Sequence, residues 1–447
     1  MPNFKSSDSD RNSSGHIQPT VAFSTVGCRL NQAETDSVME QFADRGWVKT
    51  AFKEKADLYF INTCTVTGRA DRSSRKLIHR ARRTNPDATV VAVGCFAASA
   101  AKELAEECEV DYVLGVSEKN TPFDFIPEHP HRLIAPEIHI SDDSRKTKVA
   151  VGNRVSGRSR AFLKIQDGCD HACTYCAVTL VRGKSRSVVW DEISSTMERT
   201  LAAGFEEIVI TGVDITAWGR DLSGENRDFV DLVYLASDIG FERVRISSLE
   251  PWEITEHRIR RLAENPAWCE HFHISLQSAA PDVLNRMKRP TDLDNLKTSI
   301  KTLLEVRPKS TIGADIIAGF PGETESDFKK SMDFVSAAPL HYLHVFPYSV
   351  RPGTPAAEFD NHLDPKTIAR RAEEFRRLSA YQRGNHLHNS IGNLDELLVE
   401  HDGRTGYSRG YLRTRLLDET HEPRKRVAIE ILSVDKDKDI LFARKTK

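Results

Sequence analysis

The sequence predicts an α/β protein in three parts: an N-terminal parallel α/β domain over 20–130, a central partial barrel of about six βα units over 155–385, and a small all-β barrel over 388–447. Two regions alternate apolar strands with helices, which indicates parallel βα units. After about residue 385, short strands are joined only by turns, which is typical of a small barrel. The length of 447 residues agrees with roughly three domains.

The N-terminal part has three predicted buried strands, each followed by a helix. Apolar residues at helical spacing follow the first strand up to Gly46, and basic and mixed helices are predicted over 69–83 and 98–109. The predicted strands are VAFSTVGC (21–28), DLYFINTC (57–64) and TVVAVGC (89–95).

The central part repeats the same strand–helix rhythm about six times, which favours an open or partial barrel over a closed eight-stranded one. Its predicted strands are AFLKIQ (161–166), FEEIVITGV (205–213), RVRISSL (243–249), HFHISLQS (271–278), TIGADIIAGF (311–320) and YLHVFPYS (342–349). Four further strands are predicted for the C-terminal barrel: LDELLVEH (394–401), GYLRTRLL (410–417), RVAIEILSV (426–434) and DILFARK (439–445).

Two segments are expected to lie outside these units. Residues 1–19 are polar and rich in Ser, Asp and Asn, which is typical of a disordered segment. Residues 117–160 are rich in proline at first and then charged, which indicates a linker.

The overall charge does not indicate a nucleic-acid-binding protein, because 63 basic and 65 acidic side chains give a net charge of -2. RNA contact would therefore have to come from local basic patches. No stretch approaches the roughly 18 apolar residues of a membrane span, and the first residues lack the apolar core of a signal peptide. We therefore expect a cytoplasmic protein with no membrane partner.

Three of the eight cysteines form a C-x3-C-x2-C motif in DGCDHACTYCAV: Cys169, Cys173 and Cys176. The motif follows a predicted strand, where open α/β folds place their sites. Three thiolates can bind three irons of a [4Fe–4S] cluster and leave the fourth iron open. That iron could chelate the amino and carboxylate groups of S-adenosylmethionine, which the reduced cluster would cleave to a 5′-deoxyadenosyl radical. Structural zinc sites are less favoured, because they require four ligands and no fourth cysteine lies nearby.

A second set of cysteines has no local motif. Cys28, Cys64 and Cys95 each end a predicted strand, and such strand ends share one edge of a parallel sheet. The three thiols could converge on a second cluster with an open iron, or each could simply be buried. The spacing leaves these alternatives open. We expect Cys108 and Cys269 to serve only in packing.

Several longer stretches carry a family resemblance: FSTVGCRLNQAETDS, FINTCTVTGRADRSSRKLIHRARR, VVAVGC, FLKIQDGCDHACTYCAVTLVRGKSRS, IVITGVDI, RVRISSLEP, HFHISLQS, DIIAGFPGET and HVFPYSVRPGTPAA. Through them, about residues 20–447 resemble the radical S-adenosylmethionine methylthiotransferases. The resemblance implies an auxiliary [4Fe–4S] cluster on Cys28, Cys64 and Cys95, and a radical [4Fe–4S] cluster on the C-x3-C-x2-C motif. It also implies that the C-terminal barrel is an RNA-binding TRAM domain.

The substrate implied by the resemblance is N6-threonylcarbamoyladenosine at position 37 of tRNA, next to the anticodon. FINTCTVTGRADRSSRK and HVFPYSVRPGTPAA look most like that subfamily. The implied reaction is methylthiolation of C2 of the adenine ring, with two S-adenosylmethionine molecules per product, a reductant and a sulfur donor. Family members that act on N6-isopentenyladenosine in tRNA or on a ribosomal-protein aspartate are the alternatives. Thr179, Ala279 and Pro290 depart from the usual pattern of the family.

Other polar residues near the predicted strand ends are weaker candidates. Tyr175, Gly212, Gln277 and Asp315 could bind the cofactor, with ordinary turn or surface roles as the alternative. Glu250 and Arg351 lie in similar positions. Histidines such as His341 and His344 are expected to be structural.

Basic residues offer the local support for RNA binding. The candidates are Arg72, Arg75 and Arg80 in the basic helix, and Arg409 and Arg413 near two tyrosines. Arg182, Lys184 and Arg186 follow the cysteine motif and are further candidates. Solvated helix and strand faces are the alternative for each patch. A non-catalytic RNA-binding module with a redox-sensing cluster is the alternative to an enzyme.

Overall fold

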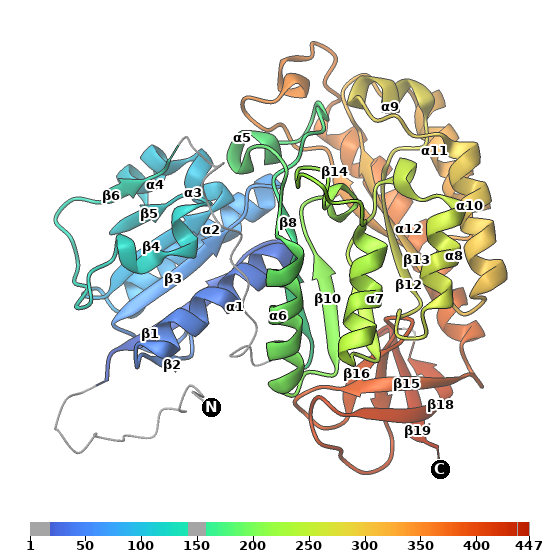
Figure 1. Cartoon of the computed structure of the whole chain (residues 1–447). Helices are drawn as coiled ribbons and strands as arrows, with labels where there is room; N and C mark the ends of the chain where they lie inside the picture. The colour runs from blue at the N-terminus through green and yellow to red at the C-terminus, as the bar shows by residue number, and fades with distance from the viewer. Residues whose placement is uncertain (1–17, 142–157, 436, 447) are drawn as a thin grey trace.

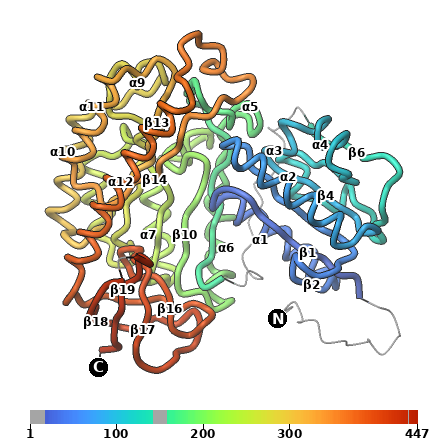
Figure 2. The backbone as a smooth tube through the Cα atoms, turned by 180° about the vertical axis from the view of Figure 1, so that it is seen from behind, coloured from blue at the N-terminus to red at the C-terminus, as the bar shows by residue number. Residues whose placement is uncertain are grey.

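The computed structural model describes residues 18–141, 158–435 and 437–446. It confirms the predicted α/β class and the arrangement in three parts (Figures 1 and 2). The N-terminal unit lies beside the central unit, and the C-terminal barrel lies against one end of the central unit. Most of the predicted disordered segment, up to residue 17, lies outside the described residues.

The strands of the first two units are β1 (Thr20–Thr25), β2 (Val48–Thr50), β3 (Leu58–Thr63), β4 (Thr89–Gly94), β5 (Tyr112–Leu114), β6 (Glu137–His139), β7 (Ala161–Lys164), β8 (Gln166–Asp167), β9 (Arg186–Ser187), β10 (Glu207–Thr211), β11 (Arg243–Ile246), β12 (His271–Gln277), β13 (Thr311–Ala318) and β14 (Tyr342–Pro347). Those of the third unit are β15 (Leu394–Val399), β16 (Thr405–Ser408), β17 (Arg413–Leu416), β18 (Arg426–Asp435) and β19 (Ile440–Lys445).

The α-helices are α1 (Arg29–Asp44), α2 (Gly68–Thr84), α3 (Cys95–Ser99), α4 (Ala101–Glu107), α5 (Val178–Arg182), α6 (Trp190–Ala202), α7 (Phe229–Ile239), α8 (Glu256–Glu264), α9 (Pro281–Met287), α10 (Leu293–Val306), α11 (Glu325–Ala337) and α12 (Pro365–Asn389). The predicted capping box of Thr324 and Asp327 is confirmed at the start of α11.

The N-terminal unit is a parallel sheet in the order β2-β1-β3-β4-β5-β6. Every residue of β3 and β4 is buried, because helices cover both faces of the sheet. Phe42 of α1 packs on one face and Ile78 of α2 on the other, in two separate apolar clusters. β1, β3 and β4 therefore end at a common edge, and the segments after them meet there.

The sheet extends into the predicted linker, since β6 pairs in parallel with β5 beyond the predicted domain limit of 130. The three-residue strand was missed because its neighbours are prolines and charged residues. The rest of the predicted linker, from 142 to 157, lies outside the described residues.

The central unit confirms the predicted partial barrel of six parallel strands. Two three-stranded sheets, β11-β10-β7 and β12-β13-β14, are joined through bridges such as Val244 to Trp268. One large apolar cluster fills the space between these strands and the surrounding helices. α1 of the N-terminal unit packs against β7, where Ala33 contacts Phe162. The N-terminal sheet edge is thereby placed next to the central strand ends.

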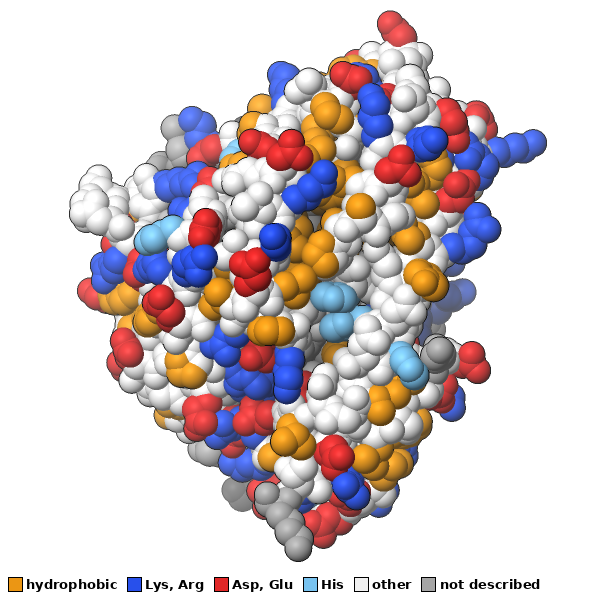
Figure 3. All heavy atoms as spheres, turned by 90° about the vertical axis from the view of Figure 1, so that its right-hand side faces the viewer, with side chains coloured by type: hydrophobic (Ala, Val, Ile, Leu, Met, Phe, Trp, Pro, Cys, Tyr) orange, Lys and Arg blue, Asp and Glu red, His pale blue; other side chains and the backbone are white. Residues whose placement is uncertain are grey.

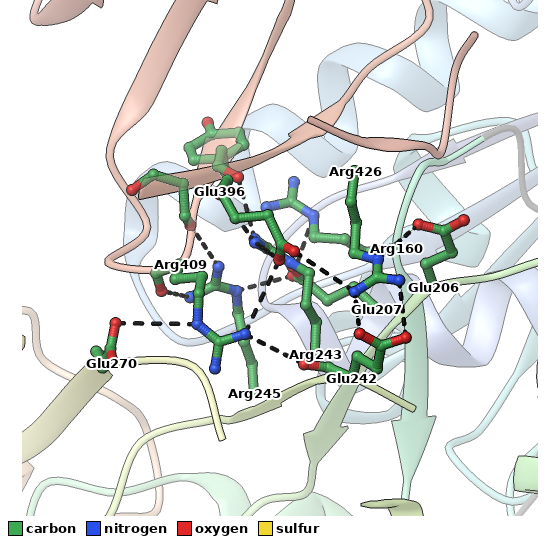
Figure 4. A network of polar contacts seen from close by, with 12 residues as sticks. Arg160, Glu206, Glu207, Glu242, Arg243, Arg245, Glu270, Glu396, Arg409 and Arg426 are labelled. Carbon is green, nitrogen blue, oxygen red and sulfur yellow. Dashed lines mark hydrogen bonds and ion pairs between the residues drawn. The ribbon is translucent and has the colours of Figure 1, made fainter. Parts of the chain in front are cut away.

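The C-terminal unit is a closed barrel in the order β15-β16-β17-β19-β18. Four strands were predicted and five are present, because the sequence of β16 reads as part of a turn. Glu207 at the start of β10 accepts hydrogen bonds from Arg243 (2.7 Å) and Arg245 (2.8 Å) on β11. Arg245 also donates to the carbonyl of Ser408 in the barrel (2.6 Å), as part of the network in Figure 4. Buried charges thus join the barrel to the core.

Candidate functional site

The first three cysteines meet at the carboxyl edge of the N-terminal sheet. Cys28 precedes α1, Cys64 follows β3, and Cys95 begins α3 after β4. Burial, together with the nearby Cys28 and Cys95, raises the pKa of the Cys64 thiol to about 12. The parallel topology therefore brings together three thiols that are 36 and 31 residues apart in sequence.

Two glycines allow close packing at this edge, Gly27 against the Cys64 thiol and Gly94 against Asn62. Gly27 has φ of +104°, and a Cβ atom there would lie 2.7 Å from the sulfur of Cys64. Gly94 has φ of +95°, and a Cβ atom there would lie 2.5 Å from the Oδ1 atom of Asn62. Both the left-handed backbone and the lack of space require glycine. This tight framework of three sulfurs fits a metal cluster held by three cysteines.

The second trio lies on the loop between β8 and α5. The backbone N–H of His171 donates to the Cys169 sulfur and that of Val178 to the Cys176 sulfur, both at 3.4 Å. Burial raises the pKa of Cys169 to about 12 and that of Cys176 to about 11. Metal binding at this loop would therefore release protons. Directed N–H groups stabilise thiolates, so this donor set also fits a cluster with three cysteine ligands.

Arg289 is a residue of this site that the sequence did not indicate. Its guanidinium donates to the Cys173 sulfur at 3.6 Å and to the Tyr175 hydroxyl at 3.4 Å. It also pairs with the carboxylate of Glu250 and stacks over Trp252, 4.8 Å from the ring centroid. Arg289 is over a hundred residues from the motif, and no spacing rule connects the two.

A cavity of about 180 Å³ is lined by residues that are close in sequence to a cysteine of each trio. Its wall includes Val66 and Thr67, which follow Cys64, and Tyr175, which precedes Cys176. The full lining is Val66, Thr67, Tyr175, Gln277, Asp315, Ile317, Phe346, Pro347, Tyr348, Ser349 and Arg351. One cavity is therefore bordered by residues adjacent to both sets of cysteines.

Three of the four predicted cofactor-binding residues line this cavity: Tyr175, Gln277 and Asp315. Gln277 ends β12 with a φ of +66°, a strained conformation for a residue other than glycine. Gly212 is not among the lining residues. A Cβ atom on Gly212 would lie 3.0 Å from the Oε1 atom of Gln166, so the backbone is closely packed there.

Asp315 accepts hydrogen bonds at its Oδ1 atom from His273 (2.9 Å) and His344 (3.2 Å). Burial opposes its ionisation, but these two histidines hold the pKa of Asp315 below its usual range. An ionised acceptor therefore lies in the cavity wall. Figure 3 shows histidine side chains in the hollow of this face, with hydrophobic side chains around them.

Among the described residues, two groups of three side chains have potential metal-ligand atoms that all lie within 4.8 Å of one another. One is His273, Asp315 and His344, and the other combines Cys169 with His171 and Asp214. His171 contacts Asp214 at 3.0 Å, so Asp214 orients the imidazole beside the cysteine loop.

A larger cavity of about 700 Å³ adjoins the first and reaches the C-terminal barrel. His344 lines it and contacts Asp315 of the smaller cavity, so the two spaces are neighbours. Tyr407 and Tyr411 stack on each other with ring centroids 4.6 Å apart. The remaining lining includes the cations Arg376, Arg383, Arg413 and Lys438. Stacked rings beside cations are features of surfaces that bind single-stranded RNA.

The predicted RNA-binding arginines fall into two groups. Arg72, Arg80 and Arg413 are exposed. Arg75 pairs with Glu103 and Glu107, and Arg409 donates to the carbonyls of the central unit, so both have partners within the chain. Arg182 was also a candidate for RNA contact. This prediction was wrong, because Arg182 is only 2 % exposed.

The other expectations concern packing and departures from the pattern. Cys108 and Cys269 are buried, as predicted. Thr179, Ala279 and Pro290 are not among the lining residues of the smaller cavity.

No helix among the described residues combines the length and the apolar character that crossing a membrane requires.

The chain matches two family models. Residues 20–115 match the uncharacterized protein family UPF0004, and residues 163–335 match the radical SAM superfamily. Among solved structures, the radical S-adenosylmethionine methyltransferase TsrM from Kitasatospora setae has a TM-score of 0.53 at 16% identity. That match covers 76% of this chain and 75% of TsrM, and at this identity it shows a shared fold.

Curated relatives cover most of the chain. The protein named threonylcarbamoyladenosine tRNA methylthiotransferase MtaB from Aquifex aeolicus (strain VF5) is 35% identical over 386 residues, 86% of this chain and 93% of the relative. The protein of the same name from Rickettsia prowazekii (strain Madrid E) is 35% identical over 383 residues, 85% and 87% of the two chains. With these relatives and the radical SAM match, the chain belongs to the radical S-adenosylmethionine methylthiotransferase family.

Proposed function

We propose that this protein is a tRNA methylthiotransferase that converts N6-threonylcarbamoyladenosine at position 37 to its 2-methylthio derivative. The observation that carries the proposal is the cavity whose wall includes Val66 and Thr67, which follow Cys64, and Tyr175, which precedes Cys176. A reaction that needs a radical and a sulfur source at one carbon atom requires both centres beside the same substrate. The names of the relatives support this nucleoside as the substrate.

The enzyme uses S-adenosylmethionine and [4Fe–4S] clusters, and we assign the ligands by their geometry. In this proposal Cys28, Cys64 and Cys95 hold the auxiliary cluster, and the C-x3-C-x2-C loop holds the radical cluster. When bound, such clusters would supply the 5′-deoxyadenosyl radical and the site of sulfur transfer. Acid–base side chains alone would not activate a C–H bond of an adenine ring.

The residues of this chain position the reactants and exclude water. Arg289 orients the Cys173 sulfur and the Tyr175 hydroxyl at one wall of the cavity. Asp315, held ionised, can accept a hydrogen bond from a ribose hydroxyl or an amino group. Apolar side chains such as Ile317 and Phe346 line the remaining wall and favour a planar base.

The proposed tRNA surface runs over two regions. The larger cavity offers the stacked Tyr407 and Tyr411 for an unpaired base, with Arg413 beside them for phosphate. The exposed face of α2 offers a stripe at helical spacing that we call the α2 basic stripe. It consists of Arg69, Arg72, Lys76, Arg80 and Arg83. The proposed domain roles are thus a sulfur-transfer unit, a radical unit and an RNA-binding barrel.

The proposed reaction also needs partners. A reductant must deliver the electrons for cleavage of S-adenosylmethionine, and a sulfur donor must replace the sulfur lost to product. Position 37 lies in the anticodon loop. We expect the enzyme to act in the cytoplasm, on tRNA that already carries the threonylcarbamoyl group.

Nucleoside analysis of tRNA tests the proposal directly. Mass spectrometry would compare tRNA from a strain lacking the gene with tRNA from the same strain carrying the wild-type gene or Cys64→Ala. We expect 2-methylthio-N6-threonylcarbamoyladenosine only with the wild-type gene. A difference confined to 2-methylthio-N6-isopentenyladenosine, or to an aspartate of a ribosomal protein, would contradict the proposed substrate. No difference together with no 5′-deoxyadenosine from the reduced enzyme would favour the RNA-binding module.

A further inference from the structure

A network of buried charges joins the N-terminal and central units between the two cysteine trios. It contains the carboxylates of Glu34 and Asp167 and the cations Lys119, Lys164 and Arg182. Each of these five side chains is at most 3 % exposed. Burying charges carries a desolvation penalty even when they are paired, so we infer that a network of this size has a function beyond stability.

Glu34 on α1 is the centre of the network. Lys119 of the N-terminal unit lies 2.5 Å from its Oε2 atom, and Lys164 of β7 lies 2.6 Å from its Oε1 atom. Arg182 donates to the same Oε1 atom at 2.9 Å. Asp167 completes the network by accepting from Lys164 at 2.7 Å and from Arg182 at 2.8 Å. Both units therefore contribute charges to one buried cluster.

Arg182 also reaches a cysteine of the first trio. Its Nε atom donates to the sulfur of Cys95 at 3.2 Å, and its Nη2 atom donates to Asn31 at 2.9 Å. Arg182 ends α5, and α5 begins two residues after Cys176. A single five-residue helix thus links the loop of the second trio to a thiol of the first.

The charges of the network do not cancel. Three cations face two carboxylates, which leaves one buried positive charge, and the more exposed Arg186 approaches Asp167 at 3.5 Å from outside. A [4Fe–4S] core of charge +2 with three thiolate ligands carries about one net negative charge. The network therefore has the charge that would balance such a cluster on Cys28, Cys64 and Cys95.

We propose that Arg182 and its buried partners act as the counter-charge of the auxiliary cluster, and that they raise its reduction potential while fixing its position relative to the radical cluster. The proposal rests on the cluster assignment made above. Arg182 is a positioning residue, because it acts on the cluster through the Cys95 sulfur.

The sign of the effect follows from electrostatics. Reduction adds a negative charge to the cluster, so a nearby buried cation stabilises the reduced form, as does a hydrogen bond to a ligand sulfur. Removing a cation should make the potential more negative. Neutralising a carboxylate of the same network should make it less negative. A purely structural role of the network does not predict opposite shifts.

The test uses the full chain with Cys169→Ala, Cys173→Ala and Cys176→Ala, so that only the auxiliary cluster remains. In this background Arg182→Gln and Glu34→Gln are reconstituted with iron and sulfide, and the potential is measured by redox titration followed by EPR. We expect Arg182→Gln to shift the one-electron equilibrium at least tenfold toward the oxidised form, about 59 mV more negative. We expect Glu34→Gln to shift it in the opposite direction.

Lys119→Gln provides a second removal of a buried cation if Arg182→Gln does not fold, and should shift the potential in the same direction as Arg182→Gln. Lys301→Gln, which removes an exposed cation on α10, is the matched control and should leave the potential unchanged. Equal potentials in all variants, or shifts of the same sign for Arg182→Gln and Glu34→Gln, would overturn the inference. If the background protein itself binds no cluster, the cluster assignment fails instead.

Discussion

At the scale of single residues, the proposed ligand sets predict separable roles for the two cysteine trios. Cys64→Ala should still form 5′-deoxyadenosine from S-adenosylmethionine with a strong reductant, because the radical cluster keeps its three ligands. Cys173→Ala should reduce that formation to background, since the open-iron cluster needs all three thiolates. Both variants should yield no methylthiolated product.

Chromatography of the nucleoside products measures this prediction. Cys108→Ala is the matched control, because Cys108 is buried away from both trios and should retain both activities. Equal loss of 5′-deoxyadenosine in Cys64→Ala and Cys173→Ala would show that the roles are not separate.

The sequence was informative about these residues only where spacing is local. The C-x3-C-x2-C loop is recognisable because its ligands lie within eight residues. Convergence of Cys28, Cys64 and Cys95 followed from parallel topology, but their burial remained an equal alternative. The buried role of Arg182 was not predictable, because a charged residue in a sequence does not reveal that Glu34 and Asp167 lie opposite it.

At the scale of elements, α2 presents its basic stripe to solvent while Arg75 and Arg82 are turned inward to carboxylates. Arg72→Ala combined with Arg80→Ala should weaken tRNA binding. It should also reduce the slope of log K against log salt by about two, since each lost phosphate contact removes about 0.9.

Fluorescence anisotropy with labelled tRNA at several salt concentrations measures that slope. Lys297→Ala combined with Lys301→Ala, on the exposed face of α10, is the control with the same change of charge. A slope that stays at the wild-type value in the α2 variant would remove α2 from the proposed tRNA surface.

The contact of α12 with the central barrel predicts a dependence of stability on pH. His341 and His386 stack with ring centroids 3.9 Å apart, and burial lowers their pKa values to about 4 and about 3. Because the unfolded pKa is about 6.5, unfolded chains bind these protons first, so stability falls as the pH drops from 6.5 toward 4. Each unit by which the folded pKa lies below the unfolded pKa corresponds to about 1.4 kcal/mol of stability lost at low pH.

His386→Gln should flatten this dependence, because glutamine does not titrate in this range. Its amide oxygen can still accept from the Thr311 hydroxyl, which contacts His386 at 2.8 Å. Urea unfolding at pH 7 and pH 5 compares the two proteins. An unchanged difference between the two pH values in the variant would contradict the burial of a neutral histidine pair.

Elements were predicted well where apolar periodicity is strong and poorly where it is not. All six strands of the central barrel were recognised from their runs of apolar residues. β16 was missed because Thr405–Ser408 includes Gly406 within a turn-like sequence. The third predicted helix is divided into α3 and α4 at Ala100, where no glycine or proline marks the break.

At the scale of the whole molecule, buried charges hold the three units in register. Glu207 is fully buried between Arg243 and Arg245, which also donate to the C-terminal barrel. Burial opposes its ionisation, but Arg245 and Arg243 lower the pKa of Glu207 to about 2. Its contribution to stability is therefore present above about pH 4.3, the usual pKa of glutamate, and is lost as the pH falls toward 2.

Glu207→Gln should destabilise the attachment of the barrel by about 3 kcal/mol, because it leaves Arg245 buried without a carboxylate and Arg243 with Glu396 alone. Hydrogen exchange should then become faster in β15 and β16 but not in β3 and β4. Glu419→Gln is the control, since Glu419 forms only an exposed ion pair with Lys445 at 3.8 Å. Uniform exchange changes across the chain would indicate general destabilisation instead.

We propose that six cysteines form two separate cluster sites beside one cavity. The most direct measurement is the iron and acid-labile sulfide content per chain after anaerobic reconstitution, in the wild type and in variants lacking either trio. We expect about eight irons in the wild type and about four in each variant, with four irons for each cluster of this type. About four irons in the wild type, or complete loss of iron when one trio is removed, would contradict it.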